Sequence, residues 1–263
     1  MTYSYSTRRL PRIGLLCILA ASVATAHADL KVVSNVVVTG KRGPKMITAI
    51  SYFKGSLVRI DNGPISRISD SKTHKTILMN NEKKVFGIAN SAEAMKKAAA
   101  SIKEQGMKFT AHIKPTGKTK MIAGRMARQY VGDLTAKGKY PPIPGSTATV
   151  TFQIDEWTTT ASGVTAGQGE MMGTISELIH TLGGMEGMKQ ATQELSKIKG
   201  IPLVSKLTGS VTIFASSGGA PKTRPLSYDT EAIAATEGTL PMSLFQVPKG
   251  YKQEGMNSKA PKK

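Results

Sequence analysis

Histidine and carboxylate side chains are the groups in this chain whose chemistry could serve catalysis. His74, His112 and His180 lie far apart and in no spacing typical of metal ligands. Asp155 and Glu156 are adjacent, so on a strand they would point to opposite faces and could not act together as an acid and a base. Neither a Gly-x-Ser-x-Gly elbow nor a His-Glu-x-x-His helix is present. The sequence therefore predicts that the protein is not an enzyme and carries no cofactor.

Methionine is the other residue type with distinctive chemistry. Thioethers bind Cu(I), but methionine is more typical of adaptable cores, so no metal site is expected. The same flexibility suits a cavity of variable shape. An ordinary helix packed on a filled core is the alternative. One helix face carries the candidate ligand-lining residues, which are Met171, Met172, Ile175, Leu178 and Leu182.

Residues 1–28 have the features of a secretory signal peptide. Arginines precede a short apolar run from Ile13 to Ala20, and Ala26-His27-Ala28 provides the small residues that signal peptidase requires. The apolar run is too short to span a membrane. Cleavage is expected before Asp29, which predicts a periplasmic protein. The general secretory route and the twin-arginine route both remain open.

The 263 residues include 36 Lys and Arg against 17 Asp and Glu, a net charge of +19. Such a charge could meet nucleic acid, an anionic membrane surface or an acidic partner. The lysines are scattered, and neither stacking aromatics nor a recognition helix is visible, so no nucleic acid is expected. Arg42, Lys45, Arg125 and Arg128 could meet acidic headgroups, although solvated surface charge is the ordinary role of such residues.

Strand patterns dominate the chain. From Leu30 to Ile88, short β-branched or alternating segments end at turn signals such as Asn62-Gly63, which predicts an antiparallel meander. Helical periodicity follows over 90–105 and returns over 171–199, with further strands between and after these zones. This order predicts an α+β fold, with helices on one face of an antiparallel sheet. We expect one domain over 29–254, with a helical insert near 171–199 and a disordered tail over 255–263.

Leu240–Tyr251, with the sequence LPMSLFQVPKGY, closes the expected domain. Its two prolines exclude a central strand, because each removes a backbone donor. Leu244 and Phe245 are expected to anchor in the core or at a sheet edge, with Tyr251 packed across the end. The segment is therefore predicted to be a structural cover and not an active site.

Several stretches together resemble a bacterial family known only as domain-of-unknown-function family 4412. The chain departs from the family at Met126-Ala127, where members often have a cysteine. The matching stretches are YFKGSLVRI (52–60), ISD (68–70), TGKTKMIAG (116–124), RMARQYV (125–131), the strand with Trp157, the Met- and Gly-rich insert, GIPLVSK (200–206) and LPMSLFQVPKGY (240–251).

At the level of fold, that family is similar to the periplasmic lipoprotein-localisation factors. The resemblance implies a strongly curved antiparallel sheet, an open half-barrel with helices on its concave face. It also implies an apolar or lipid-type ligand between sheet and helices. The resulting hypothesis is an exported, non-enzymatic binding or carrier module for a lipid or a lipidated protein. The alternative is a structural or interaction protein of the envelope, whose basic surface docks on anionic partners.

Overall fold

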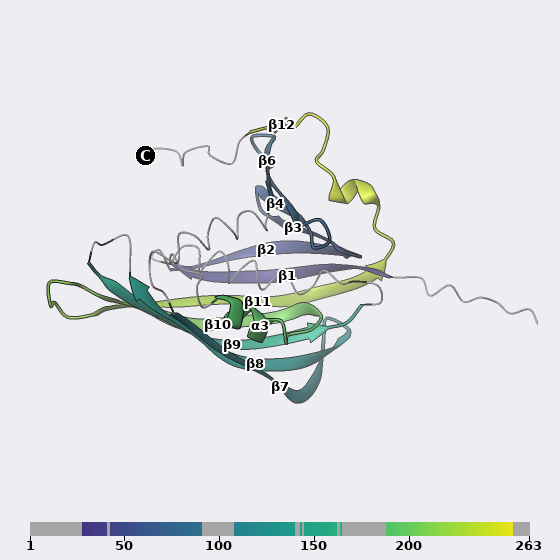
Figure 1. The fold of residues 1–263 in the computed structure, drawn as a ribbon. Coiled ribbons are helices and arrows are strands. Elements are labelled where there is room, and N and C mark those ends of the chain that lie inside the picture. The colour runs from purple at the N-terminus through teal and green to yellow at the C-terminus, as the bar shows by residue number, and fades with distance from the viewer. Residues whose placement is uncertain are drawn as a thin grey trace, which may run out of the picture.

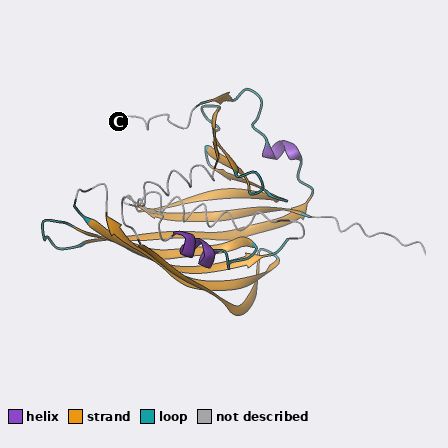
Figure 2. Cartoon of the chain, viewed as in Figure 1, coloured by secondary structure: helices purple, strands orange, loops and turns teal. Residues whose placement is uncertain are grey.

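A computed structural model describes residues 28–40, 43–90, 108–139, 143, 145–161, 164 and 188–254. Within these ranges most residues are in strands (Figure 2), with one α-helix, α3 (Met188–Leu195), and one 3-10 helix, η1 (Met242–Phe245). The strands are β1 (Asp29–Gly40), β2 (Gly43–Lys54), β3 (Leu57–Asn62), β4 (Ile65–Asp70), β5 (Lys75–Asn80), β6 (Val85–Asn90), β7 (Lys108–Ile122), β8 (Arg125–Lys139), β9 (Thr147–Thr159), β10 (Ile201–Phe214), β11 (Lys222–Gly238) and β12 (Lys252–Gln253).

All twelve strands belong to one open, curved sheet (Figure 1). Its order is β12-β6-β5-β4-β3-β2-β1-β11-β10-β9-β8-β7. Two antiparallel meanders, β1 to β6 and β7 to β11, are joined where β1 pairs with β11. Among the described strands, only β12 pairs in parallel, with β6. The meander predicted from Leu30 to Ile88 is confirmed, including the turn at Asn62-Gly63, where Gly63 has a φ of 58°.

The predicted α+β class, with helices on a concave face, is wrong. The described residues form one large sheet, and their single α-helix has eight residues. The segment 224–235 has only a weak local strand pattern, yet it lies within β11, a strand of 17 residues. The ladders of β1 and β10 on either side stabilise β11, so sheet context overrides its weak local propensity. Residues 91–105 of the first predicted helical zone lie outside the described residues, and α3 is part of the second.

Three apolar clusters stabilise the sheet. The first lies beneath α3 and includes Phe152, Ile154 and Leu195. The second lies where the starts of β1, β8 and β10 come together with the end of β9, and it includes Leu30, Trp157 and Leu203. The third is built around Ile68, Met79 and Phe245, beneath the C-terminal segment.

The C-terminal segment packs on the N-terminal meander. Phe245 is buried, and the Arg59 guanidinium donates to the carbonyl oxygen of Leu244 at 2.8 Å. The Tyr251 hydroxyl donates to the Asn81 side chain at 3.0 Å, after which β12 extends the sheet beyond β6. The predicted structural cover is confirmed: Phe245 anchors it in the third cluster, and the chain then covers the β6 edge.

Gly209 allows β10 to lie close against β9. A Cβ atom at this position would lie 1.8 Å from the carbonyl oxygen of Thr151, which is a backbone atom that cannot rotate away. We expect Gly209→Ala to lower the free energy of unfolding by about 1–3 kcal/mol or more, because overpacking must displace a strand. Urea unfolding measures the change. Gly238→Ala is the control, since nothing lies within 4 Å of a Cβ there. Equal stability of the two variants would contradict the close approach.

Phe245 is the anchor of the C-terminal segment. Truncation in Phe245→Ala leaves a cavity in the third cluster, so we expect the free energy of unfolding to fall by about 3–5 kcal/mol. Met242→Ala, which alters an exposed side chain of the same short helix, should change stability by less than about 0.5 kcal/mol. Denaturant unfolding of both variants tests the anchor, and a loss of similar size in both would contradict it.

Candidate functional site

The five candidate ligand-lining residues predicted from the sequence lie between 165 and 187, outside the described residues. Their role therefore stays a prediction. The sheet surface near α3 is described, and it provides the geometry of the candidate site.

One face of the sheet, which we call the α3 face, packs against α3. Phe152 and Ile154 of β9 point to this face, where they belong to one cluster with Ala191 and Leu195 of the helix. Alternate residues of β9 are buried in the same way, as expected for a strand with one covered face. The α3 face is therefore apolar at its centre.

Strand register carries the α3 face into the N-terminal meander. Residues paired across antiparallel strands share a face. Ile154 pairs with Leu207, and Leu207 pairs with Tyr228 of β11. Tyr228 in turn pairs with Val38 of β1. The α3 face therefore runs without interruption from β9 through β10 and β11 to β1.

The same alternation extends the face to β5. Val32 lies on the same side of β1 as Val38, because the two are six positions apart and side chains alternate between the two faces of a strand. A cross-strand row then runs from Val32 to Leu78 through Ser51, Ile60 and Arg67.

Apolar side chains on this part of the α3 face are accessible to solvent. Val38, Ile65 and Leu78 are 38–43% exposed. The cations Lys45 and Arg67 lie in the same cross-strand rows as Val38 and Leu78. Exposed aliphatic groups beside cations are suited to an amphiphilic molecule with an apolar chain and an acidic group.

A buried polar pair lies on the α3 face between the first two clusters. Glu156 is fully buried, and the Ser205 hydroxyl donates to its Oε1 at 3.0 Å. Its neighbour Asp155 lies on the opposite face, where it accepts a hydrogen bond from Gln129 at 2.8 Å. The predicted separation of the two carboxylates is confirmed. The partnership of Glu156 with Ser205 was not predicted, although strand alternation with the apolar Ile154 is a signal for Glu156 on the apolar side.

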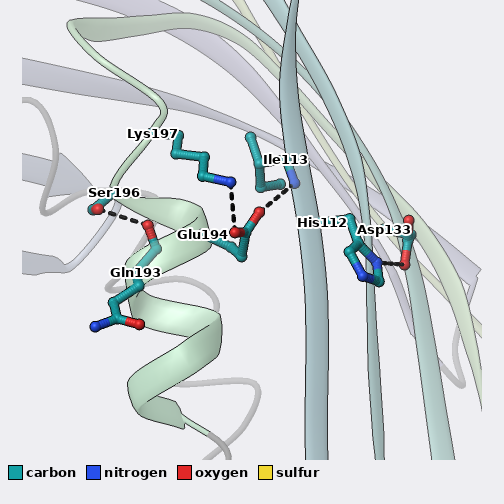
Figure 3. A network of polar contacts seen from close by, with 7 residues as sticks. All are labelled: His112, Ile113, Asp133, Gln193, Glu194, Ser196 and Lys197. Atoms are coloured by element: carbon teal, nitrogen blue, oxygen red, sulfur yellow. Dashed lines mark hydrogen bonds and ion pairs between the residues drawn. The ribbon is translucent and has the colours of Figure 1, made fainter.

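Polar contacts fix α3 to β7, the edge strand (Figure 3). The Glu194 carboxylate accepts a hydrogen bond from the backbone N–H of Ile113 at 2.9 Å. Its other oxygen accepts one from Lys197 at 2.5 Å. The hydrogen bond from Lys197, followed by that from Ile113, holds the pKa of Glu194 below its ordinary value. This side chain thus satisfies an edge donor and positions the helix.

His112 does not belong to a cluster of metal-type side chains among the described residues. It lies across β7 from α3 (Figure 3), paired at 3.3 Å with Asp133 of the neighbouring strand. The His112 side chain is largely exposed and that of Asp133 about half exposed, so the pair contributes little stability. No group of three or more metal-type side chains gathers within the described ranges. Among the helices described, none is long and apolar enough to cross a membrane.

Comparison with known proteins adds little. No family model and no curated protein matches the chain. Among solved structures, PNGF-II in space group C2 matches with a TM-score of 0.40 and 13% identity, over 88% of this chain and 31% of that one. PNGF-II in space group P21 matches with a TM-score of 0.37 and 14% identity, over 87% and 32%. The chain thus spans about a third of the length of the structures that it matches, and likeness at this level assigns no function.

The lowered pKa of Glu194 predicts a pH dependence of stability. Folding favours its carboxylate, so the contribution is present above the unfolded-state pKa and is lost as the pH falls through the folded-state pKa. We expect Glu194→Gln to lower the melting temperature at neutral pH, and the difference from the parent to shrink in acid. Thermal unfolding across this pH range measures it. Glu82→Gln, in an exposed turn, is the control. A difference that does not depend on pH would contradict the assignment.

Proposed function

We propose that the protein is an exported, non-enzymatic binding or carrier module for an apolar or lipid-type ligand, held on the α3 face. The observation that carries the proposal is that apolar side chains on this face of an open sheet, Val38, Ile65 and Leu78, are 38–43% exposed. A sheet face fully covered by other elements would leave no such surface.

The charges on this face favour a ligand with an acidic end. Lys45 and Arg67 stand beside the exposed aliphatic groups, and the chain carries a net charge of +19. A long apolar chain would lie along the aliphatic residues, while its carboxylate or phosphate would meet a cation. The signal peptide predicted over residues 1–28 is consistent with a ligand of the cell envelope.

Uptake of a fluorescent fatty acid by the purified protein tests the proposal. We expect saturable binding that weakens about tenfold or more in Leu78→Glu and in Ile65→Glu, because a carboxylate replaces apolar surface that the ligand would cover. Met46→Glu is the matched control. Met46 is 68% exposed, and it pairs with Val37, whose neighbours Val36 and Val38 point to the α3 face, so it lies on the opposite side.

Native mass spectrometry of the protein from its own compartment provides a second readout. Lipid or acyl chain bound to the parent and lost from Leu78→Glu would support the proposal. A parent that carries no lipid and takes up no fatty acid would contradict it, as would equal weakening of binding in Met46→Glu.

A further inference from the structure

The tip of the β7–β8 hairpin has an exposed apolar face. Met121 and Met126 are directly opposite each other across the two strands, and they are 60% and 56% exposed. Their neighbours Ile122 and Ala127 are buried in the second cluster. Ile122 and Ala127 therefore point to the buried face of the hairpin, and the two methionines point together to the solvent face.

The same tip is strongly basic. Five cations, and no acidic residue, lie between positions 114 and 132: Lys114, Lys118, Lys120, Arg125 and Arg128. Thr119 pairs with Arg128, so Arg128 projects from the same face of the hairpin as the two methionines. Lys118 lies at the irregularity of β7 between Pro115 and Thr119.

Two of the five cations brace the hairpin. The Lys120 ammonium lies 4.2 Å from the centre of the Trp157 ring. Arg125 pairs with Glu237 of β11 at 2.7 Å and donates to the carbonyl oxygen of Thr160 at 2.8 Å. These contacts hold the tip in place before any partner arrives, so docking would require little ordering. Lys118 and Arg128 make no side-chain contact of this kind with the described residues, and both are exposed.

We propose that this hairpin tip docks on the surface of an anionic lipid bilayer, with Met121 and Met126 in the headgroup region and Lys118 and Arg128 against acidic headgroups. Flexible, unbranched methionine suits a disordered apolar environment, and cations are attracted to anionic lipids. A protein partner is disfavoured, because a stable interface buries far more surface than two methionines provide. This docking needs no ligand on the α3 face.

Co-sedimentation with vesicles tests the proposal. We expect the protein to bind phosphatidylcholine vesicles that contain phosphatidylglycerol, to bind pure phosphatidylcholine much less, and to be released by salt. Met121→Ser combined with Met126→Ser should weaken binding about tenfold or more. Lys118→Gln and Arg128→Gln should each weaken it about fivefold.

Matched variants elsewhere on the surface separate docking from general effects. Met242→Ser alters a methionine that is 51% exposed on η1, and Lys83→Gln removes an exposed turn cation. Neither should change vesicle binding more than about twofold, since a nonspecific charge effect of one lysine is screened by salt. Equal losses in these controls and in the tip variants would overturn the proposal.

An environment-sensitive dye reports directly on the tip. Cys17 is the one cysteine of the sequence, so its replacement by serine leaves an introduced cysteine as the single labelling site. In this Cys17→Ser background, the dye attached at Met121→Cys should shift to shorter wavelength on anionic vesicles, whereas the dye at Met242→Cys should not. Binding of the parent without a shift at position 121 would mean that another surface carries it, and would overturn the assignment. Absence of binding by the parent would do the same.

Discussion

An open sheet leaves backbone N–H and C=O groups on one side of each outer strand without hydrogen-bond partners. Here short segments of the C-terminal half provide partners for some of these groups. At β7 the Glu194 carboxylate accepts the N–H of Ile113. At the other edge, the N–H of Lys252 donates to the carbonyl oxygen of Lys84 at 2.9 Å. Unpaired strand edges are sites of intermolecular pairing. These contacts let the sheet stay open, and the accessible α3 face depends on that openness.

The close approach of neighbouring strands in the C-terminal meander rests on glycines. Gly209 lies against the backbone of β9, and a Cβ atom at Gly132 of β8 would lie 2.1 Å from the carbonyl oxygen of His112. Both glycines share the side of the sheet that carries Ile113 and Phe152, because they pair with those residues. Missing side chains on one side allow strands to bend toward that side. The apolar character and the curvature of this face are therefore linked.

Local features of the fold could be predicted from the sequence, whereas distant ones could not. Asn62-Gly63 specifies its turn by itself, and alternation along β9 put Asp155 and Glu156 on opposite faces. The partner Ser205 is 49 residues away, and only the register of β9 against β10 brings the two together. The exposed pair Met121 and Met126 was equally hidden, because apolar residues in a strand pattern are ordinarily expected to be buried.

Pairing of β1 with β11 sets the order in which the molecule can fold. Ser227 donates a hydrogen bond to Thr39 across 188 residues of chain, and Leu240 donates through its backbone to Asp29, the first residue of β1. The central strand of the sheet therefore lacks one neighbour until almost the whole chain is present. Contacts between such distant segments form slowly, since a long loop must close first. The sheet is thus completed only when synthesis of the chain is nearly finished.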